Sequence, residues 1–267
     1  MDKKASKSAK LFLIAIFIIL YAPIFFLIYY SFNSGGTMSR FEGFTLDWYR
    51  ELFGDTRLLI IVLNTFVIAL LSALISTVIG VLGALAIHSY KRRQTKSTIL
   101  SLNNVLMVSP DVIIGASFLI LFTMVGIKLG FLSVLLSHIA FSIPIVVLLV
   151  LPKLTEMRPS LIDAARDLGA SNWNVLTKVT LPYITPGIFA GFFMAFTYSL
   201  DDFAVTFFVT GNGFSTLSVE IYSLARRGIS MNINALSTLI FLFTIILVIV
   251  YYFISQRNNM KTMGVRK

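Results

Sequence analysis

The sequence predicts an all-α membrane protein with six transmembrane helices and with both termini in the cytoplasm. The chain of 267 residues is 57% hydrophobic, only 13% of its residues are charged, and its mean hydropathy is +0.87. A soluble domain of this composition would lack a polar surface, so a lipid bilayer is the expected environment. The apolar residues also occur in long runs separated by short basic clusters, which is typical of a multi-pass protein.

Six apolar segments are long enough to cross a bilayer, which takes roughly 20 helical residues. The second and fifth are longer than this and are expected to tilt or to project from the bilayer. The first follows a lysine-rich stretch but precedes no small-residue cleavage site, so it predicts a retained helix rather than a signal peptide. The predicted spans are residues 11–30, 58–87, 104–127, 131–151, 184–210 and 236–254.

The basic residues predict the orientation of these spans. With the N-terminus inside, 16 of the 22 Lys and Arg residues lie on the cytoplasmic side. This bias agrees with the positive-inside rule, so the net charge of +10 indicates topology and not a nucleic-acid partner. The six external residues are Arg40, Arg50, Arg57, Lys128, Arg226 and Arg227.

The spans and connections divide the chain into three predicted regions. Residues 1–57 hold the cytoplasmic N-terminus, the first span and an external segment. Residues 58–255 form a core of five spans with a cytoplasmic loop at about 155–183, and residues 256–267 form a cytoplasmic tail. No internal repeat and no linker to a second soluble domain is evident.

The composition excludes several kinds of chemistry. Cysteine is absent, which excludes disulfides, thiolate metal sites and cysteine nucleophiles. The chain has no phosphate-binding loop of the form G-x-x-x-x-G-K-[ST], and indeed no Gly-Lys dipeptide. We therefore expect a chain with no catalytic residue, no metal and no cofactor bound to the chain itself.

The cytoplasmic loop predicts two short helices that meet at a glycine. Ser160 and Asp163 have the spacing of a capping box, and Gly169 is expected to end the first helix in a left-handed conformation. The second helix is expected to stop at Leu181-Pro182. Such an amphipathic segment either lies on the bilayer or docks into a partner, and the pattern alone does not choose. The first helix presents an apolar face of Leu161, Ile162, Ala165 and Leu168.

The same loop resembles the EAA loop of the permeases of ATP-binding-cassette (ABC) importers. The family pattern is Glu-Ala-Ala, three residues, Gly, nine residues and Ile-x-Leu-Pro. The spacing here is identical, with Asp in place of Glu and Val in place of Ile. The resemblance implies a type I ABC importer permease fold and a loop that docks into a cytoplasmic ATPase, which binds the ATP and Mg. The implied coupling residues are Asp163, Ala164, Ala165, Gly169, Leu181 and Pro182.

Three carboxylates fall inside apolar spans, where an ionised side chain costs at least ~2.5–3.5 kcal/mol. Asp111 lies in the third span, and Asp201 and Asp202 lie in the fifth. They are candidates for lining a cation pathway. Two alternatives stay open. Ser109 and Asp111 flank Pro110 as in a helix restart with Ser as the cap, and one of the adjacent aspartates could cap a break in its helix.

Further residues near these carboxylates suit a cationic substrate. Tyr198 lies among several phenylalanines, and an aromatic wall attracts alkyl-ammonium ions through cation–π contacts. Glu220 precedes the sixth span and either extends the acidic path or is solvated. We expect His88 and His138 to be hydrogen-bonded residues of the helix bundle rather than proton carriers.

Three motifs extend the resemblance to the spermidine/putrescine permeases of this family: Ser31-Phe32-Asn33-Ser34, Met107-Val108-Ser109-Pro110-Asp111 and Ser199-Leu200-Asp201-Asp202. The resemblance implies an inner-membrane permease that pairs with a second, PotB-like permease. It further implies a dimeric PotA-like ATPase inside, a PotD-like polyamine-binding protein outside, and membrane lipid around the spans. The rival functions are an ABC permease for another small cation or organic solute, and an ion-coupled secondary transporter in which the aspartates carry protons or sodium.

Overall fold

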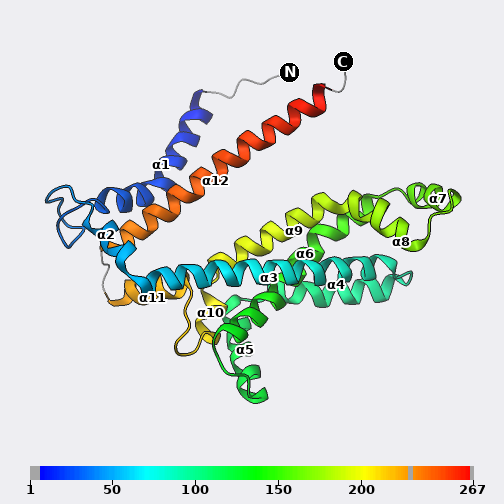
Figure 1. Ribbon diagram of the computed structural model, residues 1–267, viewed down its shortest axis with the longest axis horizontal. Helices are drawn as coiled ribbons and strands as arrows, with labels where there is room; N and C mark the ends of the chain where they lie inside the picture. Colours follow the sequence, from blue (N-terminus) through cyan, green and yellow to red (C-terminus); the bar gives the residue numbers. More distant parts are fainter. Residues whose placement is uncertain (1–6, 228–230, 265–267) are drawn as a thin grey trace. The chain divides into compact units, whose positions relative to one another are not determined.

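The computed structural model describes residues 7–227 and 231–264, which form helices and connecting loops without a β-strand (Figure 1). Lys3 and Lys4 of the predicted cytoplasmic N-terminus, and residues 265–267 of the predicted tail, lie outside the described residues. The chain divides into two compact units, Met1–Leu59 with Ile221–Lys267, and Ile60–Glu220. The prediction of an all-α chain is confirmed for the described residues.

The first unit contains α1 (Lys7–Tyr30), α2 (Asp47–Gly54) and α12 (Met231–Gly264), and α12 packs against both of the others. The segment between α1 and α2 is organised by the buried Asn33. Its Nδ2 donates to the carbonyl oxygens of Thr37 and Arg40 at 3.0 and 2.9 Å, and its Oδ1 accepts from the Glu42 amide at 2.7 Å. The Ser31–Ser34 motif therefore shapes this connection.

The second unit is built around α6 (Phe131–Glu156), which packs against helices from before and after it in the chain. Its most extensive partner is α9 (Leu181–Asp201), and it also contacts α4, α5 and α10. The bounds of the remaining long or apolar helices are α3 (Thr56–Ser89), α4 (Arg93–Val108), α5 (Asp111–Val125), α10 (Ala204–Val209) and α11 (Leu217–Arg227).

Four helical segments of the described chain are long and apolar enough to cross a membrane: Lys10–Tyr30, Thr56–Ser89, Phe131–Glu156 and Asn172–Asp201. The bent pair α4 and α5 makes a fifth if it is one span, and α12 contributes a shorter apolar stretch, Met231–Ile246. The protein is thus a helical, multi-pass membrane protein. The count of six spans and the side on which the termini lie stay predictions.

The predicted third span, residues 104–127, is not one straight helix. α4 and α5 meet at a bend of 102°, and Pro110 occupies the N-cap of α5. Proline has no amide hydrogen and clashes with the preceding turn, so the helix breaks there. The helix-restart alternative is confirmed. The role of Ser109 as the cap is wrong, because its Oγ donates backwards to the Val105 carbonyl oxygen at 2.7 Å.

The predicted fifth span, residues 184–210, lies too far toward the C-terminus at both of its ends. The helix already begins at α8 (Asn172–Val175), passes through the π-helical turn η1 (Leu176–Thr180) and continues as α9 to Asp201. The prediction that Pro182 stops a helix is wrong. Pro182 has no amide hydrogen to donate to the preceding turn, but that turn is the wider π-helical turn, and the helix continues through it. The span then ends early, because the chain leaves the helix at Asp202.

Glycines allow the close packing of α3, α6 and α9. A Cβ on Gly80 would lie 2.6 Å from Val146 Cβ, and one on Gly187 would lie 2.9 Å from the Leu149 carbonyl oxygen. Real Cβ atoms do not come this close, so these positions set the helix separation.

Replacing Gly80 by Ala is expected to lower the free energy of unfolding in detergent by about 1–3 kcal/mol, because the added methyl overpacks the α3–α6 contact. Gly83→Ala is the matched control on the same helix, since its Cβ would meet Val147 Cγ2 at an ordinary 3.6 Å. Thermal melting of the two purified variants measures the difference. Equal melting temperatures would contradict this account of the packing.

Candidate functional site

A break between α9 and α10 separates the two adjacent aspartates of the predicted pathway. Asp201 is the last residue of α9 and its side chain is exposed. Asp202 follows in an extended conformation (φ −61°, ψ 119°) and is only 9% exposed. The two carboxylates therefore have different environments.

The Asp202 carboxylate caps the short helix α10. Its Oδ2 accepts hydrogen bonds from the Thr206 amide at 2.8 Å and the Thr206 hydroxyl at 2.7 Å, and its Oδ1 accepts from the Val205 amide at 3.3 Å. These donors compensate for the loss of water around the charge. The alternative that one of the aspartates caps a break in its helix is confirmed.

His138 of α6 lies fully buried beside this cap. Its Nδ1 is 2.6 Å from Ser199 Oγ, its Nε2 is 2.8 Å from Thr206 Oγ1, and Nε2 is also 3.5 Å from Asp202 Oδ2. The prediction of a hydrogen-bonded bundle residue is confirmed for His138. The same prediction is wrong for His88, because its side chain is exposed near the end of α3.

The sequence pattern did not identify Ser199 and Thr206 as partners of His138. They follow it by 61 and 68 residues, and only the packing of α6 against α9 and α10 brings the three together. Serine and threonine in apolar helices commonly bond their own backbone, so their types alone carry little signal.

Asp111 and Tyr198, both predicted pathway residues, are in direct contact. The Tyr198 hydroxyl donates to Asp111 Oδ1 at 2.8 Å and so links the start of α5 to α9. The Tyr198 ring also packs edge-on against Phe141 of α6 at 4.9 Å. The phenol hydroxyl therefore supplies one hydrogen bond to a carboxylate that is half-buried.

Glu220 lies in the first turn of α11 and is buried, so the alternative that it is simply solvated is wrong. Its place on the acidic path stays a prediction. Of the phenylalanines that lie near Tyr198 in the sequence, Phe203 and Phe207 lie together just after Asp202, with ring centroids 5.4 Å apart. Phe208 packs instead into the unit, against the backbone at Gly115.

The predicted coupling loop contains α7 (Pro159–Asp167), which ends at Gly169 with φ +81°. The Gly169 amide donates to the Arg166 carbonyl oxygen at 2.8 Å, and the Ala170 amide donates to that of Ala165 at 3.0 Å. This is the Schellman arrangement, which requires the left-handed residue that glycine supplies. The predicted glycine stop is confirmed. The Ser160 cap is wrong, because α7 begins at Pro159.

The loop exposes large apolar side chains on both sides of Gly169. Leu168 is 89% exposed and Trp173 is 70% exposed. Asp163 and Ala164 of α7 are also exposed, and Ser171 caps α8 by accepting from the Asn174 amide at 3.3 Å. An exposed apolar surface of this kind is suited to binding a partner protein or the bilayer. Leu181 and Pro182, by contrast, form the first turn of α9.

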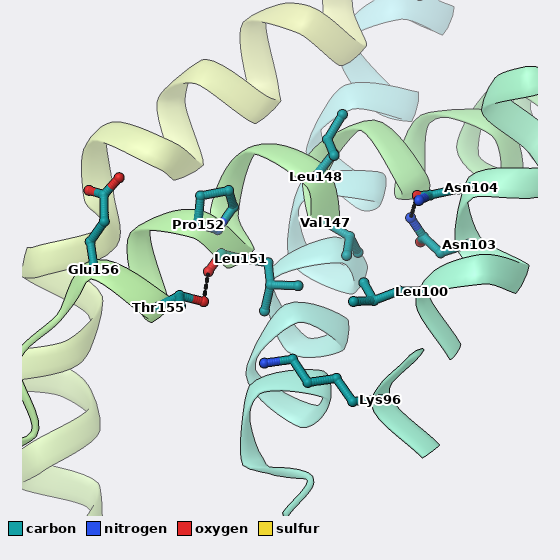
Figure 2. A pocket seen from close by; sticks show the side chains of 10 residues that line it. All are labelled: Lys96, Leu100, Asn103, Asn104, Val147, Leu148, Leu151, Pro152, Thr155 and Glu156. Atoms are coloured by element: carbon teal, nitrogen blue, oxygen red, sulfur yellow. Dashed lines mark hydrogen bonds between the residues drawn. The ribbon is translucent and has the colours of Figure 1, made fainter. Parts of the chain in front are cut away.

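A pocket of about 530 Å³ lies between α4 and α6, lined by both apolar and polar side chains (Figure 2). Lys96 lies at its wall, and the Glu156 carboxylate there is 2.8 Å from Lys153 Nζ. None of the predicted pathway carboxylates lines this pocket. With a lysine in its wall and its one carboxylate paired, it has no net negative charge to attract a cation.

Residues 76–263 match the family described as binding-protein-dependent transport system inner membrane component. The chain is similar to the spermidine/putrescine transport system permease protein PotC of Escherichia coli (strain K12), with 39% identity over 95% of this chain and 96% of the relative. The corresponding protein of Haemophilus influenzae is 35% identical over 93% of this chain and 96% of the relative. The putrescine transport system permease protein PotI of Escherichia coli (strain K12) is 35% identical over 84% of this chain and 82% of the relative.

Two solved structures share the fold at low sequence identity. A chain of a bacterial ABC transporter that imports the acidic polysaccharide alginate has a TM-score of 0.70 and 20% identity, covering 92% of both chains. A chain of the MetNI methionine ABC transporter has a TM-score of 0.58 and 18% identity, covering 73% of this chain and 95% of the other. The chain thus shares its fold with chains of these two ABC transporters.

Proposed function

Because this chain belongs to the family of binding-protein-dependent transport system inner membrane components, we propose that it is the permease subunit of an ATP-driven importer of spermidine and putrescine. It is a multi-pass protein of the inner membrane. The observation that carries the proposal is the 39% identity to PotC over 95% of the chain, which spans every helix that holds a candidate residue. The proposed role is a gate and a pathway, without bond-making chemistry.

The proposed pathway uses carboxylates to replace the water around the ammonium groups of the substrate. Asp201 suits this role because it is exposed at the end of α9, whereas the charge of Asp202 is already compensated by α10. Asp111 offers a second carboxylate, whose Oδ1 is held by the Tyr198 hydroxyl. The Tyr198 ring adds an aromatic surface for the methylene and ammonium groups of the substrate.

The proposed energy source is a separate cytoplasmic ATPase dimer, which binds ATP and Mg. In this proposal α7 docks into that ATPase, and the exposed Leu168 and Trp173 provide the apolar contact. Closure of the ATPase would move α7, and the continuous helix from Asn172 to Asp201 connects this loop directly to the pathway residues. A second, PotB-like permease would complete the pathway, and a PotD-like protein would deliver the polyamine.

Proteoliposome uptake tests this function. Vesicles that contain this chain, the second permease and the ATPase, with the binding protein and radiolabelled spermidine outside, are expected to accumulate spermidine only with hydrolysable ATP inside. Accumulation by this chain alone, or uptake that collapses with an uncoupler while ATP is maintained, would contradict the proposal and favour an ion-coupled transporter.

A further inference from the structure

The buried polar groups around His138 form one directed chain of hydrogen bonds. Thr206 Oγ1 donates to Asp202 Oδ2 at 2.7 Å, because an ionised carboxylate only accepts. The Thr206 oxygen is then free to accept from His138 Nε2–H at 2.8 Å. In the neutral imidazole this leaves Nδ1 as the acceptor of the Ser199 hydroxyl at 2.6 Å, and Ser199 in turn accepts from Ser72 at 3.0 Å.

This chain of hydrogen bonds connects residues of four helices at the break after Asp201. Ser72 belongs to α3, His138 to α6, Ser199 to α9 and Thr206 to α10. All four side chains are at most 3% exposed. Placing five polar groups, Asp202 included, in an apolar bundle costs free energy that leucine or valine would not, so their presence at a helix break is not explained by packing alone.

The break determines what surrounds the Asp201 side chain. If α9 continued, Ala204 and Val205 would follow at the i+3 and i+4 positions and cover Asp201 with an apolar turn. Instead, Val205 is buried in the cluster around α5, where its Cα lies against Gly115. Asp201 is left at an open helix C-terminus, the negative end of the helix dipole, which favours a cation.

From this geometry we infer that His138, Ser199, Asp202 and Thr206 are positioning residues, which hold the α9–α10 break open so that Asp201 is presented to the ammonium group of the substrate. The inference rests on the proposed function, because it assigns these residues to the binding of the transported cation. They do not touch the substrate themselves. Their effect on transport therefore passes through Asp201.

A double-mutant cycle between Thr206 and Asp201 tests this. Thr206→Val keeps the side-chain shape but removes the hydroxyl that links His138 to Asp202, and it is expected to lower spermidine uptake per inserted complex by about tenfold. In the Asp201→Asn background the same change is expected to lower uptake less than about twofold further, because the carboxylate that it positions is gone. Thr206→Ser is expected to retain most of the wild-type uptake.

Two further variants keep the outcome decisive. Thr197→Val is the matched control, since Thr197 is exposed on α9 and its hydroxyl bonds only its own helix, at the Phe193 carbonyl oxygen. Ser199→Ala breaks the chain on the other side of His138 and is measured in the same cycle, in case Thr206→Val does not insert. If the loss of uptake caused by Thr206→Val or Ser199→Ala were equally large in the wild-type and Asp201→Asn backgrounds, this inference would be wrong, while the proposed function would stand. A wild-type complex that takes up no polyamine would overturn the proposed function and this inference with it.

Discussion

Replacing Asp201 with Asn is expected to lower spermidine uptake by about tenfold or more. The change removes the charge at the exposed end of α9 while it keeps the size of the side chain. A hydrogen bond to a charged group is worth about 1.5–3 kcal/mol, and each 1.4 kcal/mol is tenfold in an equilibrium constant. The measurement is radiolabelled spermidine uptake in vesicles, normalised to the amount of complex in the membrane.

Asp202→Asn is the matched comparison, and it is expected to retain uptake within about threefold of wild type. The Asn carbonyl oxygen is still able to accept from the amide and hydroxyl of Thr206, so the cap of α10 survives without the charge. Asp202→Ala removes the cap and is expected to lose uptake. If Asp202→Asn lost as much as Asp201→Asn, the assignment of the pathway charge to Asp201 would be wrong. Normal uptake in both single variants and in the double variant would contradict the hypothesis of an acidic pathway.

Replacing Gly169 with Asp is expected to abolish uptake while the protein still inserts into the membrane. Gly169 has φ +81°, a conformation that costs other residues about 1–2 kcal/mol. The substitution therefore disturbs the end of α7 and places a new carboxylate beside the exposed Leu168. Because the loop is exposed, the packing of the spans is not affected. Co-purification of the ATPase with the variant is expected to fall together with uptake.

Gly126→Asp provides the control for backbone strain. Gly126 has φ +78° and, like Gly169, would place an added Cβ in open space with no atom within 4 Å, but it ends α5 and lies outside the coupling loop. It is expected to retain both uptake and ATPase binding. Equal loss in the two variants would show that glycine strain, and not the contact with the ATPase, explains the effect of Gly169→Asp.

The local sequence pattern was sufficient to predict many structural features of this protein. Hydropathy alone predicted a helical multi-pass chain, since the bilayer permits little else over such apolar runs. The spacing of Ser160, Asp163 and Gly169 predicted a short helix that ends at a left-handed glycine, and Gly169 after α7 has this conformation. The coupling role of this loop, which the resemblance to the EAA loop implies, stays a prediction. Pro110 and Asp111 also indicated a helix restart, because proline acts on the turn that contains it.

Pro182 shows where local reasoning failed. A proline after a short helix predicted a stop, yet the π turn η1 lets the helix continue to Asp201. The sequence did not reveal this, because whether a chain widens a turn or breaks it depends on the packing that holds both sides. Here Ile184 and Gly187 are buried against α6, which fixes α9 directly after the proline.

The amino-acid sequence by itself determined the class of the protein, and it predicted a coupling loop and three candidate carboxylates, since each of these follows from residue type and near neighbours. Only the tertiary structure distinguishes the surroundings of Asp201 from those of Asp202. Their types are identical and they are adjacent, so no pattern separates them. The difference comes from His138 and Thr206, which lie far from each other in the chain and meet at the α9–α10 break, where they stabilise one carboxylate in the interior and leave the other exposed.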